Sequence, residues 1–210
     1  MNPTPITNAE PNQCPPNKHV MLYFGSFNPV HKGHIAVAEW VIEHGMCDEV
    51  WFVVSPQNPH KNAASLAAEN NRLDMVRLAV EDSPCARSMR VCDIEFGLPR
   101  PSYTADTLMV LRQRYPDVEF SLLVGGDIPA KFHSWRRADE IAAHHNIYVY
   151  PRRGYDISHL EPPFMVIEGA PYEDFSSTEV RNGLVADPNN NMLTDNVMNY
   201  IKNNNLWQTK

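Results

Sequence analysis

The sequence predicts one α/β domain with a mostly parallel sheet, and two features of the chain support this prediction. Short apolar runs alternate with segments of helical periodicity, which is typical of consecutive βαβ units. The composition, with 43% hydrophobic and 20% charged residues among 210, is that of a soluble globular protein able to bury a large core. No internal repeat or linker interrupts the alternation, so we expect residues 19–210 to form a single domain.

The first strand and the first helix are expected at residues 19–24 (HVMLYF) and 33–44. The strand is a short apolar run that leads through a glycine-containing loop into the helical pattern. The helix carries a broad apolar face. This face consists of Ile35, Ala38, Trp40, Val41 and Ile42. Gly45 is well placed to end the helix.

The rest of the chain repeats this alternation of strand and helix. The further strands are expected at the apolar runs 49–55, 89–95, 119–124, 146–150 and 164–168. The further helices are expected at 69–82, 104–115, 136–144, 177–185 and 195–204. Ligands of parallel sheets bind beyond the carboxyl ends of the strands, where helices begin, so the loops there are the candidates for chemistry.

Composition and charge limit the class of protein. Residues 1–18 are polar and proline-rich, and we expect them to form a flexible extension. No signal peptide and no apolar run near the ~20 residues of a membrane span is present, so a cytoplasmic location is the default expectation. The four cysteines lack paired spacing, which favours reduced thiols over a zinc site or disulfides. The net charge of −7 argues against broad nucleic-acid binding but permits a small anionic substrate.

The loop after the first strand, GSFNPVHKGH at residues 25–34, carries residue types suited to binding phosphate. Gly25 and Ser26 let the chain turn with exposed amides, and a helix N-terminus offers unpaired N–H donors. His31 and His34 are three residues apart, so both side chains project toward one space and can donate to phosphoryl oxygens. Capping or core histidines and a metal site are alternatives, although a third metal ligand is missing. Neither GxGxxG nor the P-loop pattern is present.

The same loop resembles the GxFxPxHxGH signature of the nucleotidyltransferase superfamily with the HxGH motif. Members transfer a nucleotidyl group from a nucleoside triphosphate to a phosphate acceptor. The resemblance implies a Rossmann-like, doubly wound, mostly parallel fold of the HxGH nucleotidyltransferase type. It also implies that His31 and His34 contact the triphosphate and stabilise charge moving onto pyrophosphate. The other implied ATP-binding residues of this loop are Gly25, Ser26, Phe27 and Gly33.

A second motif, FSSTEVRNGL at residues 175–184, also predicts the start of a helix. Ser176 and Glu179 have the spacing of a capping box. On this stretch alone, an ordinary capped surface helix would be the simpler interpretation. FSSTEVR, however, resembles the ISSTxIR motif of the same superfamily. The implied triphosphate-binding residues are Ser176, Ser177, Thr178 and Arg181, with Arg181 counted among the catalytic residues.

Three further stretches resemble the nicotinate mononucleotide adenylyltransferases. SPQNPHK (55–61) is similar to their PPHK or PPHR segment, RPSYTADTL (100–108) to PSYTAxTL, and VGGDIPAKFHSW (124–135) to GxD…W. The resemblance implies that Asp127 binds the adenosine ribose of ATP. It implies that Ser26, Lys61, Tyr103, Thr104, Trp135 and Arg136 bind nicotinate mononucleotide. Trp135 would stack on the pyridine ring, with a core tryptophan as the alternative. Arg136 stands where an aromatic residue is frequent in the family, and Asn28 replaces a frequent aspartate.

The resemblance implies transfer of the adenylyl group of ATP to nicotinate mononucleotide, which yields deamido-NAD and pyrophosphate in NAD biosynthesis. A phosphate monoester is already anionic, so no strong general base is needed, and Mg2+ is expected to accompany ATP without dedicated protein ligands. Helix-start amides near Thr104 and the charge of Arg136 favour the acid over the amide of the mononucleotide. A sister adenylyltransferase with another acceptor and a non-catalytic nucleotide-binding regulator are the alternatives. The oligomeric state, including a homo-oligomer, stays open.

Overall fold

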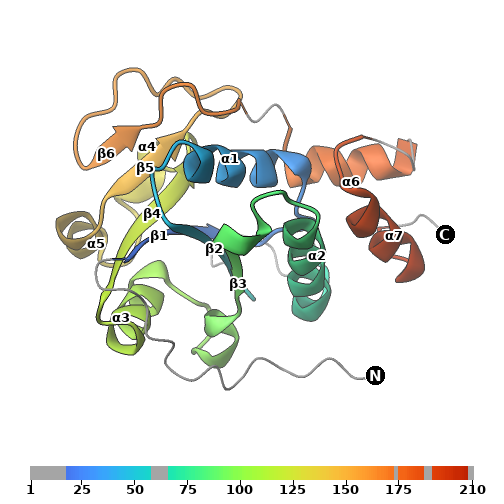
Figure 1. The fold of residues 1–210 in the computed structure, drawn as a ribbon, viewed down its shortest axis with the longest axis horizontal. Coiled ribbons are helices and arrows are strands. Elements are labelled where there is room, and N and C mark those ends of the chain that lie inside the picture. The colour runs from blue at the N-terminus through green and yellow to red at the C-terminus, as the bar shows by residue number, and fades with distance from the viewer. Residues whose placement is uncertain (1–17, 58–65, 173–174, 187–190, 208–210) are drawn as a thin grey trace.

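A computed structural model of the chain contains a six-stranded sheet in which all neighbouring strands are parallel (Figure 1). The structure describes residues 18–57, 66–172, 175–186 and 191–207. The strands are β1 (Lys18–Gly25), β2 (Glu49–Val54), β3 (Met89–Cys92), β4 (Val118–Gly125), β5 (Ile147–Tyr150) and β6 (Phe164–Val166). Their order, β3-β2-β1-β4-β5-β6, places a change of winding direction between β1 and β4. In a doubly wound sheet this is the point at which ligands bind.

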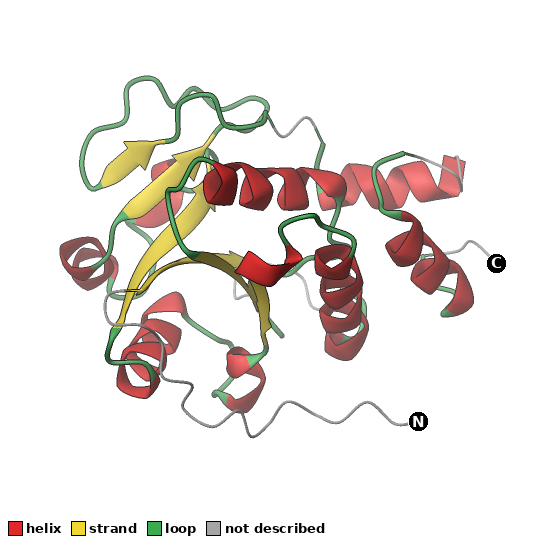
Figure 2. Ribbon diagram, viewed as in Figure 1, coloured by secondary structure: helices red, strands yellow, loops and turns green. Residues whose placement is uncertain are grey.

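Helices cover both faces of the sheet (Figures 1 and 2). One face carries α1 (Lys32–Glu43), α2 (Glu69–Glu81), α6 (Ser177–Ala186) and α7 (Asp195–Asn203). The other face carries α3 (Thr104–Arg114), the short α4 (Pro129–Phe132) and α5 (Ala138–His144). Two short 3-10 helices, η2 (Ala86–Ser88) and η3 (Ile94–Gly97), flank β3.

The central strand β1 supplies side chains to both cores. Met21 and Tyr23 pack against the core that includes α1 and α2, whereas Val20 and Leu22 pack against the core that includes α3 and α5. All four are at most 3% exposed. Successive side chains of a strand point to opposite faces, so a run that is apolar at every position is the pattern of a strand covered on both sides.

The expected strands and helices are confirmed, with a few local differences. The third strand ends at Cys92 rather than at residue 95, because the chain turns at Asp93 into η3. The fourth expected helix begins at Ala138 rather than at residue 136, because Arg137 adopts a left-handed conformation with φ 57°. The short α4 was not expected from the sequence.

Two further expectations concern the extension at residues 1–18 and membrane-spanning segments. The extension expected at residues 1–18 lies outside the described residues except for Lys18, which opens β1 and lies opposite Val118. No described helix combines the length and the apolar character that crossing a membrane requires.

Candidate active site

A cleft of about 900 Å³ opens at the carboxyl ends of β1 and β4. Most residues that the sequence motifs single out line it. They are Gly25, Ser26, Phe27, His34, Tyr103, Thr104, Asp127, Trp135, Arg136, Ser176, Ser177, Thr178 and Arg181. These residues come from the loop after β1, the start of α3, the segment after β4 and the start of α6. The topology therefore brings four separate motifs to one cavity, at the position that a doubly wound sheet reserves for ligands.

Of the three remaining motif residues, one is not among the described residues and two do not line the cleft. Lys61 is outside the described residues. Gly33 lies in the first turn of α1 and is not among the residues that line the cleft. His31 is only 2% exposed, and its ring packs 3.6 Å from the His34 ring and 4.9 Å from the Phe175 ring, measured between centroids. This differs from the expectation that both imidazoles face the same open space.

Burial also determines the charge of His31. Burial, assisted by the positive charge of Arg152, lowers the pKa of His31 to about 3. The imidazole is therefore neutral at physiological pH and brings hydrogen-bonding groups but no charge to this region.

His34 is the histidine that lines the cleft, and its tautomer is fixed by a backbone contact. Its Nδ1 accepts a hydrogen bond from the backbone N–H of His31 at 3.2 Å. Because Nδ1 is an acceptor, Nε2 carries the proton in the neutral ring and is a donor. An N–H donor at the positive end of α1 suits an anionic ligand.

The start of α6 carries the expected capping box. The backbone N–H of Ser176 donates to Glu179 Oε2 at 2.7 Å, and the backbone N–H of Glu179 donates to Ser176 Oγ at 3.3 Å. These two contacts satisfy donors that a helix end leaves unpaired and fix where the helix begins.

Side chains of α6 connect its start to the loop after β1. Ser177 Oγ donates to the carbonyl of Pro29 at 2.9 Å, and the Arg181 guanidinium donates to the carbonyl of Asn28. Arg181 also donates to Thr178 Oγ1 at 3.1 Å. Segments almost 150 residues apart in sequence are thereby joined, so that the N-termini of α1 and α6 lie at the same cleft. Two helix N-termini with an arginine between them favour a strongly anionic ligand.

Asp127, at the end of β4, forms ion pairs with Arg152 at 2.9 Å and Lys131 at 2.6 Å. Burial raises the pKa of Asp127, but hydrogen bonds and charges from Lys131 and Arg152 outweigh burial and hold the pKa below its ordinary value. The carboxylate is therefore ionised and can accept hydrogen bonds. A Cβ on Gly125 would lie 2.5 Å from Arg152 Cδ and 2.9 Å from Asp127 Oδ1, so this pair requires a glycine there.

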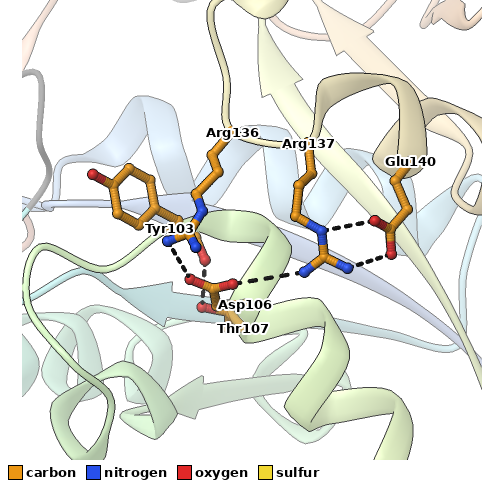
Figure 3. A network of polar contacts seen from close by, with 6 residues as sticks. All are labelled: Tyr103, Asp106, Thr107, Arg136, Arg137 and Glu140. Atoms are coloured by element: carbon orange, nitrogen blue, oxygen red, sulfur yellow. Dashed lines mark hydrogen bonds and ion pairs between the residues drawn. The ribbon is translucent and has the colours of Figure 1, made fainter.

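Aromatic and cationic side chains form the wall of the cleft near α3. Arg136 lies over the Tyr103 ring, 5.0 Å from its centroid, and pairs with Asp106 at 3.2 Å. Figure 3 shows that Asp106 lies between two guanidiniums, with Arg137 at 3.7 Å. Trp135 is half-buried against Phe132, with ring centroids 5.4 Å apart. One face of this wall suits a flat ring and its edge suits an anion.

Known proteins resemble the chain over most of its length. The model of the cytidylyltransferase-like family matches residues 22–183. A protein of Flavobacterium johnsoniae, described as a probable nicotinate-nucleotide adenylyltransferase, is 41% identical over 192 residues, which cover 89% of this chain and 97% of that protein. A protein of Bacteroides fragilis with the same description is 43% identical over 164 residues, which cover 78% and 80%. The chain belongs to the cytidylyltransferase-like family, among its nicotinate-nucleotide adenylyltransferases.

A solved structure of more distant sequence has the same fold as this member of the family. The Plasmodium falciparum nicotinic acid mononucleotide adenylyltransferase complexed with NaAD aligns with a TM-score of 0.78 at 20% identity. The alignment covers 91% of this chain and 98% of that chain. The Rossmann-like, doubly wound architecture expected from the sequence is thus confirmed.

Two buried charged residues of this adenylyltransferase were missed by sequence reasoning. Arg72 of α2 is 1% exposed and donates to the carbonyls of Ser26, Ser55 and Pro56 at 2.7–2.8 Å. Glu95 of η3 is 1% exposed and lines the cleft. Neither residue has a distinct signal in the sequence, because Arg72 stands among the polar residues that open α2 (ENNR) and Glu95 ends the mixed run MRVCDIE. Arg152, which the sequence left unassigned, lines the cleft as well.

Proposed function

We propose that the protein transfers the adenylyl group of ATP to nicotinate mononucleotide, producing deamido-NAD and pyrophosphate in NAD biosynthesis. The observation that carries this proposal is the joining of two helix N-termini at one cleft, through Ser177 to Pro29 and Arg181 to Asn28. Such a site suits a polyphosphate, and the aromatic wall opposite suits a pyridine ring. Membership of the nicotinate-nucleotide adenylyltransferases supports the same substrates.

The triphosphate of ATP is proposed to bind between α1 and α6. The donors there are the backbone amides of the loop after β1, the Nε2–H of His34 and the guanidinium of Arg181. His31, packed behind His34, is proposed to hold that ring in place. The further proposed ATP-binding residues are Gly25, Ser26, Phe27, Gly33, Ser176, Ser177 and Thr178. The ionised carboxylate of Asp127 is proposed to accept hydrogen bonds from the ribose hydroxyls.

Nicotinate mononucleotide is proposed to bind against the start of α3. Trp135 offers a face for the pyridine ring, and the amide of Thr104 together with Arg136 suits its carboxylate. The remaining proposed contacts are from Ser26, Tyr103 and Lys61.

The reaction is proposed to be a direct in-line displacement. An oxygen of the acceptor phosphate attacks the α-phosphorus of ATP, the bond to the bridging oxygen breaks, and pyrophosphate leaves with the electron pair. Because the nucleophile is anionic, the protein's task is alignment of the two phosphates and stabilisation of the developing charge. His34 and Arg181 lie at the α1 and α6 ends where that charge would form. Mg2+ is proposed to enter with ATP, held by phosphate oxygens and water.

Pyrophosphate release from ATP tests the proposal. With nicotinate mononucleotide present, we expect release together with formation of a dinucleotide, and without an acceptor we expect almost none. A sister adenylyltransferase would release pyrophosphate only with another acceptor, such as phosphopantetheine. A non-catalytic regulator would bind ATP and release no pyrophosphate with any acceptor. Either result would contradict the proposal.

A further inference from the structure

The carboxylate of Glu95 is held by three hydroxyl groups at the floor of the cleft. Ser55 Oγ donates to Oε2 at 2.7 Å, Ser102 Oγ donates to Oε2 at 2.5 Å, and Thr107 Oγ1 donates to Oε1 at 2.9 Å. All three hydroxyl residues are at most 7% exposed. Among the described residues, no lysine or arginine lies within ion-pair distance of Glu95. Three hydroxyl donors thus satisfy both oxygens of the buried carboxylate.

Two of these contacts enclose the start of α3. Ser102 precedes the helix and Thr107 lies in its first turn, so Glu95 is bonded on both sides of Tyr103 and Thr104. Tyr103 is the N-cap, and within the described part of the chain its side chain makes no capping hydrogen bond. The side-chain cap that usually fixes a helix start is therefore lacking. The start of α3 is instead anchored by two hydroxyls, those of Ser102 and Thr107, which donate to a buried carboxylate from η3.

The third contact extends from Glu95 toward the loop after β1. Ser55 follows β2, and while its hydroxyl donates to Glu95, its carbonyl accepts from Arg72 at 2.7 Å. The same guanidinium nitrogen donates to the carbonyl of Ser26 at 2.7 Å. A continuous series of buried contacts thus connects the phosphate-binding loop with the start of α3.

Burying an ion without a counter-ion is costly, and an apolar side chain would stabilise the fold at less expense. We propose that Glu95 is a positioning residue for the acceptor: it holds the start of α3 so that Tyr103 and Thr104 face the cleft. This inference rests on the proposed function, because the acceptor is the ligand assigned to that helix start. The donor, ATP, is assigned to α1, α6 and the loop after β1, which Glu95 reaches only indirectly through Ser55 and Arg72, so we expect ATP binding to depend on Glu95 much less than acceptor binding does.

The test compares steady-state kinetics of the Glu95→Gln variant with the wild-type enzyme. Gln keeps the size of the side chain but removes its charge and replaces one acceptor oxygen with an NH2 donor. The hydroxyl that faces this NH2 group must reverse its role and accept, and the other hydroxyls donate to a neutral instead of a charged oxygen. We expect the KM for nicotinate mononucleotide to rise roughly tenfold, the size of a lost charged hydrogen bond, with the KM for ATP within about twofold of wild type. The preference for the acid over the amide mononucleotide should also fall, because the amide of Thr104 shifts.

Three further variants distinguish an effect on acceptor binding from a general loss of folding. Thr107→Val removes one hydroxyl at constant shape and should raise the acceptor KM about threefold, while Thr107→Ser should restore it. Glu49→Gln is the matched control, since Glu49 is an interior carboxylate at the opposite end of β2, bonded to Lys18 and Trp51. It should lower thermal stability without changing either KM.

Particular results would overturn the inference. One is an unchanged acceptor KM in Glu95→Gln and Thr107→Val. Another is an equal rise of both KM values, in parallel with lost stability, as expected of a purely structural residue. Failure of the proposed function is distinguishable, because then the wild-type enzyme itself would form no dinucleotide.

Discussion

Replacing Arg136 with glutamine should weaken discrimination between the acid and the amide of the mononucleotide. The Arg136 guanidinium lies over the Tyr103 ring and pairs with Asp106 at 3.2 Å, at the edge of the acceptor wall (Figure 3). Arg137 lies 3.7 Å from the same carboxylate. Arg136 can therefore turn to a substrate carboxylate while Asp106 keeps one cationic neighbour.

The size of the effect follows from the exposure of Arg136. A hydrogen bond between charged groups contributes about 1.5–3 kcal/mol when shielded, whereas exposed ion pairs contribute about 0.2–1 kcal/mol. The Arg136 side chain is 55% exposed, and it gives up its contact with Asp106 when it binds substrate. We therefore expect a net contribution of about 1 kcal/mol, which corresponds to roughly fivefold in the ratio of kcat/KM for acid over amide.

The assay measures kcat/KM for nicotinate mononucleotide and nicotinamide mononucleotide in the wild type and in Arg136→Gln. The ratio should fall about fivefold in the variant, chiefly through the acid. Arg137→Gln is the control, since Arg137 shares Asp106 but pairs mainly with Glu140 and does not line the cleft. An unchanged ratio in Arg136→Gln, or an equal loss with both mononucleotides, would refute the reasoning.

Two further predictions concern the histidines. His34→Ala should lower kcat for pyrophosphate release about 10²–10³-fold, because the Nε2–H donor is lost, with little change in the melting temperature; near-normal turnover would exclude a catalytic role. His31 has a pKa of about 3 when folded against 6.5 for the unfolded reference, so the unfolded chain binds the extra proton between these pH values and stability falls on acidification. Between pH 7 and pH 5 this residue should cost about 2 kcal/mol of unfolding free energy. Urea titrations at both pH values should show a correspondingly smaller loss in His31→Gln, and an identical pH dependence would contradict the assigned burial.

Elements with a strong local pattern could be predicted from the sequence. The apolar runs of β1 and β2 are buried on both sheet faces, which is why they are apolar at almost every position. The start of α6 was predictable because its capping box lies within four residues. The four-residue α4 is too short to show helical periodicity in the sequence. No local sequence pattern predicts the left-handed conformation of Arg137.

The position of a site residue could be predicted where the spacing within one short motif determines it. It could not be predicted where the residue's contacts are with partners distant in sequence. Spacing places His31 and His34 on one side of the helix, but it cannot show that Phe175 covers the first ring. Similarly, Glu95 meets Ser55 from 40 residues away, and Arg72 meets the carbonyl of Ser26 from 46 residues away. Both are buried charges, whose partners only the folded chain reveals.

The partners of the cationic side chains explain how a chain with net charge −7 can bind a polyphosphate. Arg72 and Arg181 donate to backbone carbonyls around the loop after β1, and within the described ranges neither lies at ion-pair distance from a carboxylate. Burial lowers the pKa of both guanidiniums, that of Arg72 to about 10, yet both stay charged at neutral pH. Carbonyl dipoles orient these charges without cancelling them, unlike the carboxylates beside Arg136 and Arg152. Arg181 lines the cleft, so a bound triphosphate would supply the negative charge that no described carboxylate provides to this guanidinium.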